Sequence, residues 1–460
     1  VSMSSDGNYA IVGAHQEDTG GSNAGAAYVY VRSGSTWTQQ AKITASDAQA
    51  SDQFGQGVAI NSDATYAIIG SQFEDGGAGD PLNAAGAAYI FTRSGSTWTE
   101  QAILRASDPQ AADFFGRATS ISGDGSYAIA GSHNEDGGAG DPNPNAGAAY
   151  VYVRSGSTWT EQAILRASDG YTVPTEQGDF FGLSVSISSD GNYAIVGATG
   201  EDGGAGNPLS GAGAAYVFTR SGSTWTEQAK LTASDAQASV NFGIIASMSS
   251  DGSYAIVGAN LEDTGGSNAG AAYIYVRSGS TWTQQAKIVS SDLQAGDQFG
   301  ASVSMSSDGT YAIVGAKSED GGAGNPLSGA GAAYIYTRSG STWTEQAILR
   351  ASDAQVDDSF GHIVSINSDA TYVIVGASGE DGGAGDPNSQ AGAAYIFERS
   401  GSTWTQVRKL TASDAQASDQ FGYPVSISGD GSYAIVGASG EDGGAGDPLS
   451  TAGAAYIYEA

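Results

Sequence analysis

The sequence has no cysteine, only 3 His and 10 Pro, and only 17 Lys and Arg in 460 residues. Without cysteine, the chain has no disulfides, no thiolate metal site and no cysteine nucleophile. The 49 Asp and Glu give a formal net charge of −32. This charge repels phosphate backbones, so we expect no nucleic-acid partner. No apolar run approaches the roughly 20 residues that span a bilayer, so we expect no membrane insertion.

What the sequence does have is 69 Gly and a segment that repeats along its whole length. The marker GSTWT recurs with Trp37, Trp98, Trp159, Trp225, Trp282, Trp343 and Trp404, at spacings of 61, 61, 66, 57, 61 and 61. The longest interval carries an insertion at 170–178, and the shortest lacks four residues after Asp263. Because both changes fall in expected loops, the pattern indicates a repeat architecture.

Each repeat predicts four short strands. In one copy, residues 183–188 alternate apolar residues with serine, and an Asp-Gly turn leads into an apolar strand at 193–198. A Gly-rich acidic loop then precedes a third strand at 213–219. A tight link at 220–223 returns the chain as a fourth strand at 224–232. No segment has a sustained helical period, so the predicted class is all-β.

Four-stranded antiparallel units repeated in this way predict the blades of a single β-propeller over residues 1–460. The pattern contains 31 strands, one fewer than eight blades need and three more than seven need. We therefore expect eight blades, with seven blades plus extra strands as the alternative. The expected blades span 1–53, 54–114, 115–180, 181–241, 242–298, 299–359, 360–420 and 421–460. The last lacks its outer strand, which a strand upstream of Val1 would supply.

A Phe-Gly pair opens every repeat from the second onward. The pairs are Phe54-Gly55, Phe115-Gly116, Phe181-Gly182, Phe242-Gly243, Phe299-Gly300, Phe360-Gly361 and Phe421-Gly422. An alternating strand, an IVGA-type strand and Gly-Ala-Ala-Tyr follow each pair. This order resembles the FG-GAP repeat of integrin alpha-subunit heads and of many microbial surface proteins. The resemblance implies a β-propeller in an extracellular or cell-surface setting, with a role in adhesion or ligand binding.

The chain departs from the integrin pattern in one respect. Integrin-type blades often carry a DxDxDG calcium loop between the first two strands, whereas this chain has only a tight turn there, as at Asp190-Gly191. The family's calcium site therefore does not carry over to any position in this sequence.

The acidic residues are unevenly placed. Antiparallel order puts the first-to-second and third-to-fourth strand links at one end of a blade, where we expect turn aspartates to pair with seven arginines. The other two kinds of link lie at the opposite end and hold 35 of the 49 acids. We expect this acidic face to bind a protein or glycan ligand.

Eight of these acidic loops carry a Glu-Asp pair, and four add a further Asp. Clustered carboxylates with nearby carbonyls suit a hard cation, so the loops predict calcium sites. The candidate ligands are Glu17, Asp18, Glu74, Asp75, Asp80, Glu135, Asp136, Asp141, Glu201, Asp202, Glu262, Asp263, Glu319, Asp320, Glu380, Asp381, Asp386, Glu441, Asp442 and Asp447. The alternative is that these acids cap turns through backbone N–H groups and keep the surface soluble.

Catalytic signatures are scarce. The carboxylates recur at nearly the same positions in every repeat, whereas a catalytic site needs a particular set of residues that differs from the repeated pattern. His15, His133 and His362 do not cluster in sequence, and the position of the first two varies between copies, which we interpret as tolerant surface. The sequence has no GxSxG elbow, phosphate loop or HExxH helix. We therefore predict that the chain is not an enzyme.

The insertion at 171–177 is the one unique loop, so Tyr171, Thr172 and Val173 are the candidate partner-binding residues. The repeated Trp and Tyr are interpreted as blade packing rather than sugar-stacking platforms. The sequence thus predicts a noncatalytic extracellular module with a structural, adhesive or partner-binding role, within a larger surface protein or assembly. Open strand edges can also support self-association. The alternative is a carbohydrate-binding or carbohydrate-active propeller.

Overall fold

The computed structural model describes residues 1–77, 82–138, 143–169, 178–203, 209–322, 324, 327–381, 388–441 and 453–460. Within these ranges the chain forms 31 β-strands and no helix. The all-β prediction is therefore confirmed. Among these residues, no helix could cross a membrane.

The strands form eight antiparallel sheets, each built from strands that are consecutive in the chain. The first four are β1 (Ser2–Met3), β2 (Tyr9–Ala14), β3 (Ala26–Ser33) and β4 (Thr36–Ile43); β5 (Val58–Ile60), β6 (Tyr66–Ser71), β7 (Ala87–Ser94) and β8 (Thr97–Leu104); β9 (Thr119–Ile121), β10 (Tyr127–Ser132), β11 (Ala148–Ser155) and β12 (Thr158–Leu165); and β13 (Phe181–Ile187), β14 (Tyr193–Ala198), β15 (Ala214–Ser221) and β16 (Thr224–Leu231).

The remaining sheets continue in the same order. They are β17 (Ala246–Met248), β18 (Tyr254–Ala259), β19 (Ala271–Ser278) and β20 (Thr281–Ile288); β21 (Ser302–Met305), β22 (Tyr311–Ala316), β23 (Ala332–Ser339) and β24 (Thr342–Leu349); β25 (Phe360–Ile366), β26 (Tyr372–Ala377), β27 (Ala393–Ser400) and β28 (Thr403–Leu410); and β29 (Phe421–Ile427), β30 (Tyr433–Ala438) and β31 (Ala454–Glu459). Seven sheets have four strands, and the last has three among the described residues.

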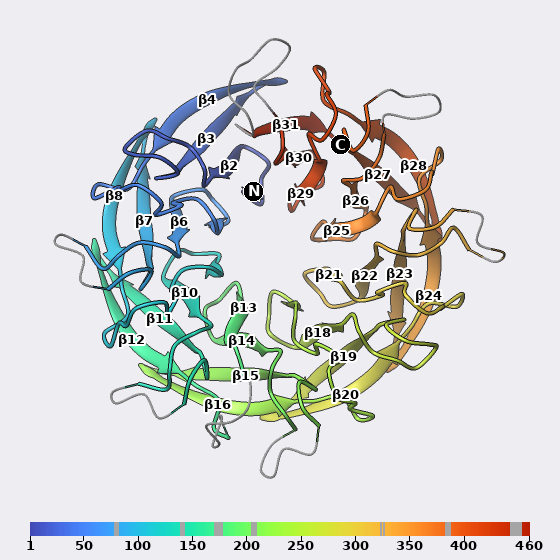
Figure 1. The fold of residues 1–460 in the computed structure, drawn as a ribbon, viewed down its shortest axis with the longest axis horizontal. Coiled ribbons are helices and arrows are strands. Elements are labelled where there is room, and N and C mark those ends of the chain that lie inside the picture. The colour runs from blue at the N-terminus through green and yellow to red at the C-terminus, as the bar shows by residue number, and fades with distance from the viewer. Residues whose placement is uncertain are drawn as a thin grey trace. The chain divides into compact units, whose positions relative to one another are not determined.

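These sheets are the eight blades of a β-propeller, so the eight-blade prediction is confirmed and the seven-blade alternative is wrong. The chain divides into two compact units. One contains residues 2–252 and 277–282, and the other contains Val1 and residues 253–276 and 283–460. In the second unit, Figure 1 shows the strands of a blade following one another as layers, from β25 to β28.

In most blades the two middle strands are the buried ones, as their continuous apolar runs predict. In β14 all residues after Tyr193 are buried, and in β15 the first five are buried. The first and fourth strands are only partly covered. The hairpin between β15 and β16 is tighter than predicted, because Arg220 and Ser221 still belong to the strand and the turn is Gly222-Ser223.

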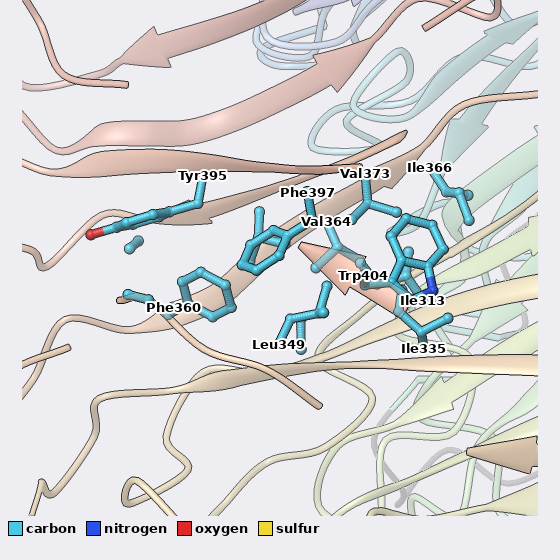
Figure 2. Close-up of a cluster of buried hydrophobic side chains, with 14 of the residues drawn as sticks. Ile313, Ile335, Leu349, Phe360, Val364, Ile366, Val373, Tyr395, Phe397 and Trp404 are labelled. Atoms are coloured by element: carbon cyan, nitrogen blue, oxygen red, sulfur yellow. The ribbon is translucent and has the colours of Figure 1, made fainter. Parts of the chain in front are cut away.

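The core lies between successive blades, as Figure 2 shows for one cluster. Phe360 is fully buried there and meets Tyr395 at 5.4 Å and Phe397 at 6.1 Å between ring centroids. Ile313 and Ile335 of the preceding blade belong to the same cluster. The phenylalanine of each Phe-Gly pair therefore packs in the core between two successive blades.

The glycines of the repeat are required by close backbone contact. A Cβ added at Gly315, in the second strand of its blade, would lie 2.0 Å from the carbonyl oxygen of Gly361 in the next blade. Gly361 itself has φ +90°, a conformation that side chains disfavour. The Phe-Gly pair and the IVGA strand thus recur together because each blade's glycine packs on the next blade's glycine.

Candidate functional site

A shared cation joins the loops of neighbouring blades at their acidic end. Arg105 Nη2 donates to Asp47 Oδ2 and to Glu74 Oε1, both at 2.7 Å. The hydroxyl of Tyr89 donates to the other oxygen of Asp47 at 2.8 Å. The Glu74 side chain is 3% exposed, so this glutamate is a buried anion balanced by a nearby guanidinium.

The same arrangement recurs with either Arg or Lys as the cation. The other clusters are Arg166 with Asp108 and Glu135, Lys230 with Asp169 and Glu201, Arg350 with Asp292 and Glu319, and Lys409 with Asp353 and Glu380; Lys42 pairs with Glu17 and Lys287 with Glu262. The glutamates of seven of the eight predicted Glu-Asp pairs therefore contact protein cations.

The described aspartates of the pairs accept backbone hydrogen bonds within their own loops. Asp75 Oδ1 accepts from the N–H of Ala84 at 2.8 Å, and Asp320 Oδ1 accepts from that of Gly329 at 2.9 Å. Equivalent bonds reach Asp18, Asp136, Asp202, Asp263 and Asp381. This geometry is what the turn-capping alternative predicts.

The calcium hypothesis stays a prediction. The part of the chain that the structure describes holds no group of three or more His, Asp or Glu placed to bind a metal ion. Other predicted residues lie outside the described residues: the acids Asp80, Asp141, Asp386, Asp442 and Asp447, and the partner-binding candidates Tyr171, Thr172 and Val173.

At the opposite end of the blades, the arginines bind carbonyls and aromatic rings. Arg93 Nε donates to the carbonyl of Ala64 at 2.7 Å, and its guanidinium lies 4.2 Å from the ring centroid of Tyr9 in the preceding blade. Arg154 repeats this arrangement with Gly125 and Tyr66. The predicted pairing of these arginines with turn aspartates is therefore replaced by carbonyl hydrogen bonds and cation–π contacts.

A cavity of about 200 Å³ lies beside the turns between first and second strands in the unit of residues 2–252. Its lining includes Asn61, Ser62, Ser188, Ser249 and Met248, and none of its lining residues is titratable. It can accept hydrogen-bonding ligands or water, but it offers no acid or base.

Within each blade, side chains that differ from copy to copy lie at the other end of the first strand. Two positions vary from blade to blade there: the residue after Phe-Gly and the residue after the second strand. The first set is Gln56, Arg117, Leu183, Ile244, Ala301, His362 and Tyr423, and the second is His15, Gln72, His133, Thr199, Asn260, Lys317, Ser378 and Ser439.

One blade brings a histidine and a serine together at these two positions. The ladder between β25 and β26 jumps from Phe360↔Ala377 to Val364↔Val375, so residues 361–363 bulge out of the regular pairing. The bulge places His362 beside Ser378, with Nδ1 and Oγ 3.0 Å apart. When Nε2 carries the ring proton, Nδ1 accepts the serine hydroxyl proton.

The surroundings keep this histidine neutral. Burial, assisted by the positive charge of Lys317, lowers the pKa of His362 to about 4. The ring of Tyr423 stacks on the imidazole, with centroids 4.7 Å apart and planes at 22°. Tyr423 is 41% exposed, so the pair lies at the protein surface, within reach of a ligand.

The unit of residues 2–252 has a different pair at the same two positions. His133 Nε2 lies 3.3 Å from Arg117 Nη1, and its ring stacks on Phe114 with centroids 5.7 Å apart. Burial, and then the charge of Arg117, lowers the pKa of His133 to about 4. Since no hydroxyl takes the place of Ser378, this histidine has no nucleophile to activate.

A serine hydroxyl that donates to a neutral imidazole is one arrangement that can serve as a nucleophile with its general base. This pair is not apparent in the sequence because His362 and Ser378 lie 16 residues apart and neither belongs to a known motif. The signal in the sequence is the residue after Phe-Gly, which differs in every copy.

The FG-GAP repeat family profile matches residues 1–30, 37–91, 98–152, 159–218, 225–275, 282–336, 343–397 and 404–458. The match covers most of the chain, which therefore belongs to the FG-GAP repeat family. The resemblance inferred from the sequence is thereby confirmed. No curated protein sequence matches the chain significantly.

Two solved structures share the fold. The periplasmic gluconolactonase PpgL of Pseudomonas aeruginosa has a TM-score of 0.51 and 13% identity, over 89% of this chain and 97% of its own. A putative 6-phosphogluconolactonase of Bacteroides uniformis has a TM-score of 0.50 and 10% identity, over 88% of this chain and 96% of its own. At such identities the likeness shows the fold alone.

These structures overturn the prediction that the chain is not an enzyme. Propellers that share its fold are named as lactonases, so a repetitive blade architecture does not argue against catalysis. The prediction failed because it was based on the repeated carboxylates, which hold neighbouring blades together. The residues that differ between blades lie at the ends of the first strands instead.

Proposed function

We propose that the chain is a carbohydrate-active propeller that hydrolyses the acyl–oxygen bond of an uncharged sugar lactone or sugar ester at Ser378 and His362. The observation that carries the proposal is the 3.0 Å contact between Ser378 Oγ and His362 Nδ1, next to the partly exposed Tyr423. The names of the two structurally similar lactonases support the choice of bond.

The chemistry needs only water as co-reactant. Ser378 Oγ attacks the carbonyl carbon while His362 Nδ1 takes its proton. The ring or ester C–O bond breaks, and the leaving oxygen receives that proton. Water then attacks the acyl-serine, and its proton passes through His362 back to Ser378. A lactone gives a hydroxy acid, whereas an ester gives a carboxylic acid and the alcohol released in the first step.

The charge distribution favours a neutral substrate. A net charge of −32 repels anionic sugars over long range but leaves an uncharged lactone unaffected. Lys317 is near enough to lower the pKa of His362 and can attract the oxygen that becomes negative during attack. The product carboxylate, in contrast, is expelled by the same net charge.

An exported location is part of the proposal. It is supported by the FG-GAP repeats, which many microbial surface proteins carry, and by the periplasmic description of one structurally similar protein.

The test is proton release from glucono-1,5-lactone in a pH-stat at pH 6, corrected for spontaneous hydrolysis. The expected result is catalysed release that Ser378→Ala lowers by about 10³-fold or more. Ser439→Ala is the matched control, because Ser439 takes the same position in the next blade and bonds to Gln420 instead of a histidine. Catalysis that survives Ser378→Ala, or no catalysis of any neutral lactone or ester by the wild-type chain, would overturn the proposal.

A further inference from the structure

In the unit of residues 2–252, the turns between the first and second strands of five successive blades form a continuous wall. The backbone N–H of Ser5 donates to the carbonyl of Ser62 at 3.1 Å, and that of Ser62 donates to the carbonyl of Gly123 at 3.1 Å. The next turns continue the series, with Gly123 donating to Ser189 at 2.9 Å and Ser189 donating to Ser250 at 3.1 Å. Because each turn is fixed by its neighbour, the wall is organised before any ligand binds.

The serine hydroxyls of this wall are available to a ligand. The bonds between turns use backbone groups, and within the described part of the chain four side-chain hydroxyls have no hydrogen-bond partner: those of Ser5, Ser62, Ser189 and Ser250. Each of these hydroxyls can donate one hydrogen bond and accept two. Three of the four serines are exposed and Ser62 is half-buried, so a ligand can reach them from solvent.

Gly123 provides space among these hydroxyls. The other four turns have serine at the equivalent position. A Cβ added at Gly123 would lie 2.3 Å from Ser189 Oγ and 2.9 Å from Ser62 Oγ, which is closer than unbonded atoms approach. The two hydroxyls therefore converge on the space that a side chain would fill, and they line the cavity of about 200 Å³ described above.

The size and charge of the cavity select a small neutral ligand. Its volume corresponds to roughly six or seven waters at about 30 Å³ each, which is similar to the volume of one sugar ring. The lining has no carboxylate to hold a cation and no basic group to hold an anion. An aspartate directly follows each of the five turn residues, so an anionic ligand would also be repelled: Asp6, Asp63, Asp124, Asp190 and Asp251.

We propose that this cavity binds one neutral sugar residue, whose hydroxyls replace the waters and form hydrogen bonds with Ser62 and Ser189 on either side of Gly123. Neutral hydroxyls that both donate and accept are the groups that a serine-lined wall can satisfy. The site shares no residue with Ser378 and His362, so it does not depend on the proposed hydrolysis.

The test uses the methyl glycosides of glucose, galactose and mannose as probes, with saturation-transfer difference NMR on the full chain. The expected result is saturable transfer to at least one glycoside. Its carboxylate counterpart, the methyl glycoside of the matching uronic acid, is expected to bind at least about tenfold more weakly. No saturable transfer to any of the three glycosides, or equal binding of the neutral and anionic forms, would overturn the proposal.

A trisaccharide of the bound sugar distinguishes two sources of the ligand. Affinity equal to or higher than that of the glycoside would identify the ligand as the end of a glycan chain. Lower affinity would identify it as the free sugar. Both outcomes support a site for one neutral sugar residue.

Protein variants locate the site. Gly123→Ser introduces the residue that the other four turns have, so the blade is expected to fold. Because the new side chain occupies the cavity and displaces both hydroxyls, the variant is expected to bind the sugar at least about tenfold more weakly. Unchanged affinity would overturn the proposal. Binding that Ser378→Ala abolishes and Gly123→Ser retains would place the sugar at the pair of His362 and Ser378 and would also overturn it.

A matched pair of double variants tests the hydroxyls themselves. Ser62→Ala combined with Ser189→Ala is expected to weaken binding about tenfold, because two hydrogen bonds to the sugar are lost. Ser307→Ala combined with Ser368→Ala is the control, since these serines take the same turn position in blades whose described residues do not line the cavity. Equal affinities of the two double variants would contradict binding by Ser62 and Ser189.

Discussion

The acid–base clusters between blades and the ends of the first strands are both parts of the same repeat, yet they vary in opposite ways. The cluster keeps its glutamate and aspartate from blade to blade, and only its cation changes. The cation is Arg105, Arg166 or Arg350 in some blades and lysine in others. At the first-strand ends, in contrast, nearly every side chain changes from blade to blade. His362 meets Ser378 in one blade, and His133 meets Arg117 in another.

The difference follows from what each region must satisfy. A glutamate that is 0% exposed, such as Glu319, needs a cation in every copy, so its surroundings cannot change. The first-strand ends are held by glycine–glycine backbone contact and by a buried phenylalanine, so their outward side chains are free to differ. Repetition here marks packing, and variation marks the candidate site.

The largest expected effect is on the variable region. His362→Ala is expected to lower kcat/KM for lactone hydrolysis by about 10³-fold because Ser378 loses its base. Its melting midpoint should change little, since the ring loses only a stacking contact worth about 1 kcal/mol. His133→Ala, made in the other histidine pair, is expected to leave hydrolysis unchanged. Equal losses in both variants would refute the distinction between the two pairs.

The reverse pattern is expected for the repeated region. Arg350→Met leaves Glu319 buried without its guanidinium, so urea unfolding should show a loss of about 2 to 3 kcal/mol, with lactone hydrolysis retained. Arg408→Met, at an exposed position on a fourth strand, should change stability by less than about 0.5 kcal/mol. A stable Arg350→Met variant would show that the cluster does not hold the blades together.

A smaller effect concerns the buried aspartates that lie two residues before six of the seven Phe-Gly pairs. Burial raises the pKa of Asp358 to about 7, with Glu380, Asp353 and Asp381 adding repulsion. One oxygen accepts the Gln355 N–H at 2.7 Å, and the other has no hydrogen-bond partner. The Lys409 cation nearby is already shared between Asp353 and Glu380.

Because the pKa of Asp358 is raised in the folded state, its contribution to the free energy of unfolding is fully present below about pH 4. This contribution is lost as the pH rises to 7. Asp358→Asn should therefore raise the melting midpoint by about 2 to 4 °C at pH 8 and not at pH 4.5. Asp357→Asn, the exposed neighbour, is the control. Val240, buried at the equivalent position of another loop, shows that the site accepts an uncharged residue. Equal shifts at both pH values would contradict the titration.

The smallest expected effect is that of calcium. Because the described Glu-Asp pairs already bind cations or backbone N–H groups, calcium should raise the melting midpoint by no more than about 2 °C. The measurement is a melting curve in 5 mM calcium followed by one with excess chelator. A larger, chelator-reversible rise would show that the acidic loops are metal sites.

Much of the fold could be predicted because each strand carries its own pattern. The period of 61 residues, the Asp-Gly turns and the apolar run at Tyr193–Ala198 predict the sheets correctly. The contact between His362 and Ser378, on which the proposed hydrolysis depends, could not be predicted from such local signals. His362 and Ser378 are ordinary residues in sequence, and only the bulge after Phe360 places them in contact.

The acidic residues that give the net charge of −32 show the same limit, because the sequence does not reveal which groups they contact. The sequence alone determined that the acids fall in loops at one end of each blade, because strand order and turn positions are local properties. Only the tertiary structure decided what those acids do. Arg105 must fold against both Asp47 and Glu74, which are 58 and 31 residues away, before the carboxylates become packing elements. Contacts over such separations depend on how blades pack, which no single repeat encodes.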